Sequence, residues 1–311
     1  MLKQFALFSL VLLLFSACAT KRPVTWKERV VQSKVEPLNL VYDEYGDKSK
    51  ETLLFLHGFG ESRHTWRFLV PALSKKYHLI MLDLKGFGDS PKTEDHYYSV
   101  YDQAQVVSAF IKKKQLHHLT LVGRSFGGGV ALVLTLMQKD QLIQPNVERL
   151  VLINSMAYKQ QLPSMLRTLN QPLIGYLAIH LVSDDWMAEE GYRYAFYNDS
   201  LIPKKSVYYS STALSYPLAK YAYLETVDQL IPDDIETVER RYREIDLPSL
   251  ILWGKEDVSI RVFTARKLER DLKHSKLIVL PHVGHMPQEE APNKVVYEIL
   301  KFMEETKQHF D

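Results

Sequence analysis

A serine between two glycines, placed where an apolar strand pattern gives way to a helical pattern, constrains this chain more than any other feature. The run from Leu119 to Val122 is typical of a buried strand, and a helical pattern extends from about Phe126 to Gln138. The turn between them is Gly123-Arg124-Ser125-Phe126-Gly127, whose glycines let strand and helix approach closely. A serine on such a turn presents its hydroxyl group at the positive end of the helix. Ser125 is therefore predicted to be a nucleophile; the alternative is a glycine-rich turn with an incidental serine.

Strands and helices alternate along much of the chain. Apolar runs typical of strands buried on both faces occur at residues 52–56, 78–83, 119–122, 147–153, 247–254 and 276–280. Helical patterns occur at about 65–75, 100–114, 126–138, 261–272 and in a closing segment to about 306, and residues 38–45 alternate like an edge strand. This order predicts an α/β fold with a doubly wound, mostly parallel sheet, in which ligand sites lie at the carboxyl ends of strands. His57, Asp83, Ser125 and Asn154 all fall at such ends.

The alternation stops between residues 156 and 244, where helical stretches are rich in tyrosine and no clear buried strand occurs. We predict that residues 156–244 form a helical cap insertion over the active edge of the sheet. The insertion divides the sheet domain into residues 35–155 and 245–311. Its aromatic side chains either line a ligand pocket or pack in a small core of the insertion itself.

The first 34 residues are predicted to lie outside the fold. Residues 1–17 combine one lysine with an apolar segment too short to span a bilayer comfortably, as in a signal peptide, and residues 18–34 form a polar, basic tether. Ser16-Ala17-Cys18 resembles the lipobox of bacterial lipoproteins, although Phe15 stands where an aliphatic residue is more usual. The resemblance implies lipidation of Cys18 and an exported, membrane-anchored protein, and Ala19 after the cysteine favours the outer membrane or cell surface. An ordinary secretory signal or an uncleaved anchor is the alternative.

Composition and missing motifs exclude several classes of protein. The formal net charge is +2 and no basic block interleaved with aromatic residues occurs, so no nucleic-acid partner is expected. Cys18 is the only cysteine, so we expect no internal disulfide. The sequence lacks a His-Glu-x-x-His pattern, a cysteine cluster and a phosphate-binding Gly-x-x-x-x-Gly-Lys-Ser/Thr pattern. Neither a metal nor another cofactor is therefore expected.

Three polar residues follow predicted strands in the order Ser125, Asp257 and His285. A serine hydroxyl needs a base to take its proton, and the base needs a third group to orient it. This order, with the serine turn and the loop His57-Gly58-Phe59-Gly60, resembles the α/β-hydrolase family over about residues 38–306. The resemblance implies that His285 is the base and that Asp257 is its orienting acid.

The resemblance also assigns an oxyanion hole, which needs two backbone N–H groups. The N–H of Phe126, directly after the nucleophile, and the N–H of Phe59 are the expected donors. His282 and His57 remain rivals for the base, and Glu256 is the neighbouring rival for the acid.

Two further strand-end residues bear on these assignments. Some α/β-hydrolases carry the acid after the preceding strand, where this chain has Asn154, and this favours Asp257. Asp83 resembles a structural aspartate that holds the loop from Gly86 to Ser90.

We expect a serine hydrolase that cleaves small-molecule carboxylic esters, with an apolar acyl part, through an acyl-enzyme. Ser125 disfavours the haloalkane dehalogenases and epoxide hydrolases of this fold, which use aspartate at the turn. Capped family members that use serine also include hydrolases of carbon–carbon bonds in ring-cleavage products, but these often have Asn where Arg124 stands. A non-catalytic binding lipoprotein on the same scaffold is the alternative from another class.

Overall fold

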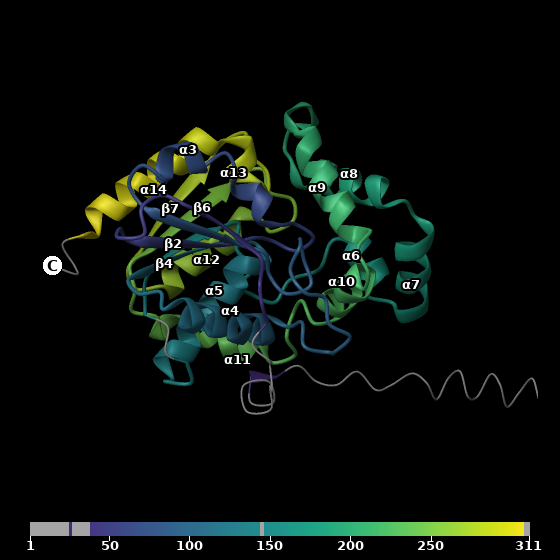
Figure 1. Ribbon diagram of the computed structural model, residues 1–311, viewed down its shortest axis with the longest axis horizontal. Coiled ribbons are helices and arrows are strands. Elements are labelled where there is room, and N and C mark those ends of the chain that lie inside the picture. The colour runs from purple at the N-terminus through teal and green to yellow at the C-terminus, as the bar shows by residue number, and fades with distance from the viewer. Residues whose placement is uncertain (1–24, 27–37, 144–145, 308–311) are drawn as a thin grey trace, which may run out of the picture.

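A seven-stranded sheet forms the centre of the molecule, with the strand order β1-β3-β2-β4-β5-β6-β7 (Figure 1). The computed structural model describes residues 25–26, 38–143 and 146–307, so the predicted signal peptide and most of the predicted tether lie outside the described residues. The strands are β1 (Tyr42–Tyr45), β2 (Thr52–Leu56), β3 (His78–Leu82), β4 (Leu119–Arg124), β5 (Val147–Ile153), β6 (Ser249–Gly254) and β7 (Ser275–Leu280). β1 pairs antiparallel with β3, and the other neighbours pair in parallel. The predicted α/β fold with a mostly parallel sheet is confirmed.

Helices cover both faces of the sheet. Side chains alternate along a strand, so on β2 Leu54 and Leu56 enter one hydrophobic core while Leu53 and Phe55 enter the other. The first core packs under α4 (Val100–Lys114), α5 (Phe126–Lys139), α11 (Ile235–Arg240), η3 (Arg241–Glu244) and α12 (Val262–Asp271). The second packs under η1 (Arg63–Trp66), α3 (Val70–Leu73) and α14 (Pro292–Glu305), which the short helix α13 (Pro287–Glu290) precedes.

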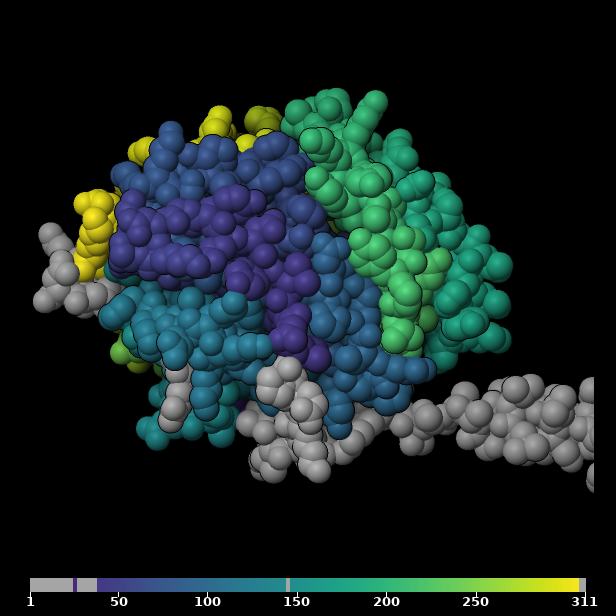
Figure 2. All heavy atoms as spheres, in the orientation of Figure 1, coloured from purple at the N-terminus to yellow at the C-terminus, as the bar shows by residue number. Residues whose placement is uncertain are grey.

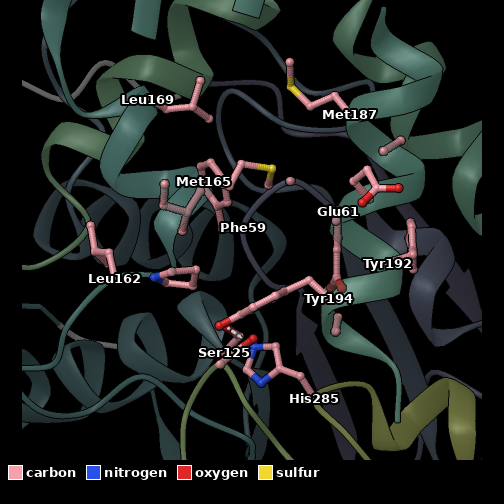
Figure 3. Close-up of a pocket in the computed structure, with 18 of the residues that line it drawn as sticks. Phe59, Glu61, Ser125, Leu162, Met165, Leu169, Met187, Tyr192, Tyr194 and His285 are labelled. Carbon is pink, nitrogen blue, oxygen red and sulfur yellow. Dashed lines mark hydrogen bonds between the residues drawn. The ribbon is translucent and has the colours of Figure 1, made fainter. Parts of the chain in front are cut away.

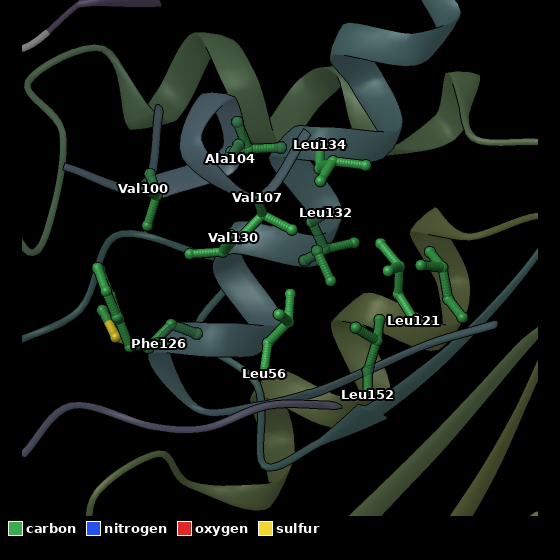
Figure 4. Packing of buried hydrophobic residues seen from close by; sticks show 14 of the residues in the cluster. Leu56, Val100, Ala104, Val107, Leu121, Phe126, Val130, Leu132, Leu134 and Leu152 are labelled. Atoms are coloured by element: carbon green, nitrogen blue, oxygen red, sulfur yellow. The ribbon is translucent and has the colours of Figure 1, made fainter. Parts of the chain in front are cut away.

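The first core is centred on α5, the helix that follows the serine turn. Figure 4 shows strand residues meeting residues of α4 and α5 there, among them Leu56, Leu121, Leu152, Ala104, Val107, Val130 and Leu132. All seven are fully buried. The position of α5, and with it the serine turn, is therefore set by close packing against three parallel strands.

Two sequence predictions were wrong in detail. The helix expected at 65–75 is instead two short turns, η1 and α3, because Pro71 lacks an N–H group and its ring would clash with the carbonyl group of Arg67. The edge strand expected at 38–45 is confined to β1, and the Val41 N–H donates to the Ser90 hydroxyl group instead of a strand neighbour, at 2.9 Å.

The segment between β5 and α11 is helical and stands beside the sheet as a separate lobe, seen in green in Figure 2. Its helices are α6 (Ser164–Leu169), α7 (Pro172–Leu181), α8 (Asp184–Ala195), α9 (Lys204–Leu214) and α10 (Ala219–Asp228), with the short η2 (Asp199–Leu201). We call these helices the cap. The cap has a small core of its own, formed by Leu169, Ile179, Met187, Leu214 and Val227. None of the helices in the described ranges combines the length and apolarity needed to cross a membrane.

Candidate active site

The turn between β4 and α5 holds Ser125 in a strained backbone conformation, with φ of 50° and ψ of −118°. A residue with a side chain rarely adopts such a positive φ, and it persists here because the surroundings fix it. A Cβ atom on Gly127 would overlap the carbonyl group of Leu56, and one on Gly123 would lie 2.6 Å from the Gly127 oxygen. The two glycines therefore permit the close approach of strand and helix that the sequence predicts.

Ser125, His285 and Asp257 are joined by a chain of hydrogen bonds. The Ser125 Oγ lies 3.0 Å from Nε2 of His285, and Nδ1 of His285 lies 2.7 Å from Oδ2 of Asp257. The three side chains come from the ends of β4 and β6 and from the loop after β7, and all three are buried. The structure thus brings together the three residues that the sequence order singles out.

The Asp257 carboxylate is held by three groups besides His285. Its Oδ1 accepts from the N–H groups of Ser259 (2.7 Å) and Ile260 (2.9 Å), and its Oδ2 accepts from the Asn154 amide. Burial raises the pKa of Asp257, but its interactions with His285 and these donors outweigh burial and leave the pKa below its ordinary value. Asp257 is therefore ionised at neutral pH.

The rivals for base and acid lie elsewhere. His282 is exposed. His57 is fully buried with Nδ1 2.7 Å from the Gly58 oxygen, and its Nε2 accepts from the Leu84 N–H. Glu256 accepts from the Val283 N–H at 3.1 Å. None of the three rivals is bonded to Ser125 or to His285 in the part of the chain that the structure describes.

Burial lowers the pKa of His285 below its ordinary value. The positive charge of Arg124 lowers it further, while Asp257 opposes both effects. The ring is therefore neutral at pH 7, as a group that accepts a proton from serine must be.

Arg124 and Glu61 form a buried ion pair beside the three residues, which sequence reasoning missed. The Arg124 guanidinium also donates to the backbone oxygen of His285, from Nε at 3.2 Å and from Nη2 at 2.9 Å. The other carboxylate oxygen of Glu61 accepts from the Gly58 N–H at 3.0 Å. One ion pair thus links the loop that carries His285 to the loop that carries Phe59.

The cap also holds the loop that carries His285. The His285 N–H donates to the oxygen of Ala195, the last residue of α8, at 2.7 Å. The Glu290 carboxylate accepts from the Tyr197 N–H of the cap at 2.9 Å and from the Gly284 N–H at 3.0 Å. The end of α8 and the loop after β7 are therefore fixed to each other next to His285.

The two expected oxyanion donors flank Ser125. Phe126 is the first residue of α5, and the N–H group at the start of a helix has no acceptor within that helix. Phe59 follows Gly58, where an added Cβ atom would lie 3.2 Å from the Ser125 Cβ atom. The backbone of Gly58 thus lies next to Ser125, and the oxyanion role of the Phe59 and Phe126 N–H groups stays a prediction.

Asp83 holds its loop together, as its resemblance implies. Its carboxylate accepts from the Asp89 N–H at 2.8 Å and pairs with the Arg63 guanidinium. Ser90 donates to the Asp83 backbone oxygen at 2.7 Å. These contacts account for the Asp83 carboxylate without a part in the chemistry at Ser125.

A cavity of about 570 Å³ opens above Ser125, between the sheet and the cap. Its walls are mainly apolar, and Figure 3 shows Ser125 and His285 at one end with Leu162, Met165, Leu169 and Met187 around the remaining space. Of the many cap tyrosines, Tyr192, Tyr194 and Tyr223 line the cavity. Others are largely exposed, namely Tyr176, Tyr197 and Tyr208. Only some of the cap tyrosines therefore line the cavity, as one of the two sequence alternatives expects.

The part of the chain that the structure describes contains no group of three or more His, Cys, Asp or Glu side chains that could hold a metal ion.

Residues 51–292 match the family described as alpha/beta hydrolase fold, and the chain belongs to this family. Lipase 1 of Psychrobacter immobilis is 26% identical over 259 residues, which cover 81% of this chain and 76% of the lipase. A 2-hydroxy-6-oxo-6-(2'-aminophenyl)hexa-2,4-dienoic acid hydrolase of Metapseudomonas resinovorans is also 26% identical, over 81% of this chain and 84% of that protein. The crystal structure of a putative lipase from Acinetobacter baumannii AYE is similar with a TM-score of 0.72 and 27% identity, covering 94% of this chain and 99% of that chain. The protein is therefore a hydrolase of the α/β fold.

Proposed function

We propose that the protein cleaves carboxylic esters through an acyl-enzyme on Ser125. The observation that carries the proposal is the hydrogen-bond chain from Asp257 through His285 to Ser125, which ends in a mainly apolar cavity. The likeness to two proteins named as lipases supports an ester as the substrate. The cavity walls favour an apolar acyl group, because burying apolar surface contributes about 25 cal/mol per Å².

In the proposed reaction, Ser125 Oγ attacks the ester carbonyl carbon while His285 Nε2 takes the hydroxyl proton. The N–H groups of Phe59 and Phe126 stabilise the negative charge that develops on the carbonyl oxygen. The carbon–oxygen bond to the alcohol then breaks, and the leaving alcohol takes the proton from His285. Water, deprotonated by His285, attacks the acyl-enzyme and releases the acid with Ser125 restored.

The alternative within the family is cleavage of a carbon–carbon bond in a ring-cleavage product by the same three residues. The ring-cleavage hydrolase and Lipase 1 match this chain at equal identity, so identity does not separate the two reactions. Turnover of a nitrophenyl ester and of a 2-hydroxy-6-oxohexadienoate can be compared directly. Faster turnover of the dienoate would replace the ester proposal.

Replacing Ser125 with alanine tests the proposal. We expect Ser125→Ala to lower ester turnover by about 10⁴-fold or more and to abolish labelling by a fluorophosphonate probe. Ser249→Ala is a matched control. Ser249 is also buried, but it lies at the end of β6 away from Asp257, and its hydroxyl group donates to the Leu247 oxygen. Unchanged labelling of Ser125→Ala would assign the nucleophile to another residue, and absence of labelling in the wild type would leave a non-catalytic binding protein.

We further propose that the chain is exported and anchored by lipid on Cys18. The support is the Ser16-Ala17-Cys18 sequence after an apolar segment, and these residues lie outside the described part of the structure. One acyl chain binds a membrane only marginally, whereas several chains give stable anchoring. We expect Cys18→Ser to leave the precursor unprocessed or to release the protein from the membrane fraction. Normal processing of this variant, with no lipid on the native N-terminal peptide by mass spectrometry, would contradict the anchor.

A further inference from the structure

Helix α7 presents an apolar face to solvent. The side chains of Leu173, Ile174, Tyr176, Leu177 and Leu181 are between 46% and 79% exposed. The outward face of a surface helix is normally polar, so this pattern is reversed. Figure 1 shows α7 at the outer edge of the cap, on the side away from the sheet.

The segment that carries this face is uncharged and partly aromatic. Residues 168–183 contain no Asp, Glu, Lys or Arg, and the His180 ring packs against the Tyr176 ring at 4.2 Å between centroids. Trp186, just beyond α7 at the start of α8, is 54% exposed. Tryptophan and tyrosine are enriched where a protein meets the boundary between lipid headgroups and acyl chains.

The opposite side of α7 belongs to the cavity. Ala178 and Val182 line the cavity above Ser125, and Ile179 is buried in the core of the cap. The exposed apolar face is therefore separated from the cavity by about the thickness of one helix, roughly 10 Å.

The length of chain before the described fold limits how far the protein can stand from a lipid anchor. Trp26 is fixed to the domain, because its backbone N–H donates to Asp234 at 2.6 Å and its ring centroid lies 5.5 Å from that of Tyr101. The step from Cys18 to Trp26 spans at most about 29 Å when fully extended. A domain of this size is about 45 Å across. A lipid on Cys18 therefore keeps one face of the protein close to the bilayer.

We propose that the outward face of α7 docks onto the surface of a lipid bilayer, with Leu173, Leu177 and Leu181 inserted among the acyl chains. The inference draws on the proposed anchor at Cys18 and does not depend on catalysis by Ser125. The proposed lipid on Cys18 would hold a bilayer within about 29 Å of Trp26, and on this ground we take a bilayer rather than a second copy of the chain as the occupant. Docked in this way, the cap would place its cavity one helix away from membrane lipid.

A chain that begins at Ala19 tests the face without the anchor, since it keeps every residue that the structure describes. Flotation with vesicles of phosphatidylethanolamine and phosphatidylglycerol measures its binding. We expect the triple variant Leu173→Ser, Leu177→Ser and Leu181→Ser to bind these vesicles with an affinity at least about tenfold lower than that of the wild type. High salt should leave wild-type binding intact, because the face carries no charge.

The control removes equally exposed apolar side chains from the sheet domain, at Leu142, Phe263 and Tyr297. This variant should bind vesicles like the wild type, and circular dichroism checks that both triple variants fold. The chain from Ala19 has no cysteine, so Leu177→Cys and Leu142→Cys each provide a single labelling site. When vesicles are added, the emission of a polarity-sensitive dye should shift to shorter wavelength if the dye is attached at position 177, but not if it is attached at position 142.

Three results would overturn the inference. Absence of vesicle binding by the chain from Ala19 is the first. Equal binding by the α7 variant, lost in high salt, would assign binding to the basic tether. Self-association that the α7 variant loses, seen by analytical ultracentrifugation without vesicle binding, would assign the face to a second copy. Fluorophosphonate labelling in the same samples reports the proposed catalytic function separately.

Discussion

Replacing Arg124 with methionine should both destabilise the protein and shift its pH–activity profile. Methionine keeps much of the length of the side chain but removes the charge and every donor. The variant loses two hydrogen bonds to the His285 oxygen and leaves the Glu61 carboxylate buried without its cation. The Gly58 N–H remains as a donor to that carboxylate.

The magnitude follows from the burial of the pair, in which both side chains are less than 10% exposed. Removing one partner of a buried ion pair costs about 3–5 kcal/mol, because the other charge is left uncompensated. At about 2 °C per kcal/mol for a chain of this length, Tm should fall by roughly 6–10 °C. Replacing both partners, as Arg124→Met with Glu61→Met, should recover much of the loss, because no buried charge then remains.

The pH profile separates a role at the site from general stability. The charge of Arg124 helps to lower the pKa of His285, so its removal raises that pKa and moves the acidic limb of kcat/KM to higher pH. Arg149→Met is the matched control, because Arg149 is buried and pairs with Glu51 at 3.0 Å at the other end of the sheet. It should lower Tm and leave the acidic limb in place.

Thermal unfolding of the single and double variants, with kcat/KM measured across pH, completes the double-mutant cycle. One result would refute this reasoning: Arg124→Met lowers the free energy of unfolding by less than about 1 kcal/mol and keeps the acidic limb of the wild type. The Arg124–Glu61 pair would then be no stronger than a surface ion pair. A second contrary result is that the losses of the two single variants simply add in the double variant.

Two further predictions concern the base and the cavity. In the wild type, kcat/KM should stay high as pH falls to about 6.5, the ordinary pKa of histidine, and decline only below it, because burial and Arg124 lower the pKa of His285. His282→Gln should keep this profile and His285→Gln should be inactive at every pH; the reverse result would show that the base is misassigned. Met165→Trp should narrow the cavity and lower hydrolysis of nitrophenyl dodecanoate about tenfold while sparing the acetate, since each buried methylene contributes about 0.8 kcal/mol. Equal losses for both esters would count against an acyl group in this space.

The parallel strands could be predicted well because they are buried on both faces and so appear as continuous apolar runs. The order of Ser125, Asp257 and His285 was also accessible, since each follows such a run. The helix expected at 65–75 was wrong because its apolar spacing is helical but Pro71 interrupts the run of helical hydrogen bonds.

Glu61 could not have been found from the sequence. An acidic residue in a loop is ordinarily a solvated one, and the contact with Arg124 joins positions 63 residues apart. Asn154 was noticed at the end of its strand, but its hydrogen bond to Asp257 depends on the pairing of β5 with β6 across the whole cap insertion. Both contacts are set by tertiary packing and leave no local pattern.

The hydrogen bond between Ser125 and His285 spans 160 positions of the chain, and this separation orders events during synthesis. Ser125 and the strands that precede it, β1 to β4, emerge from the ribosome long before His285 does. β6 can pair with β5 only after the entire cap has been made, and the loop that carries His285 follows β7. Domains fold as their elements become available, so a chain made only as far as the cap holds Ser125 without its partner His285. The proposed hydrolysis requires the completed sheet, so the onset of activity in a translation reaction would time the docking of β6 and β7.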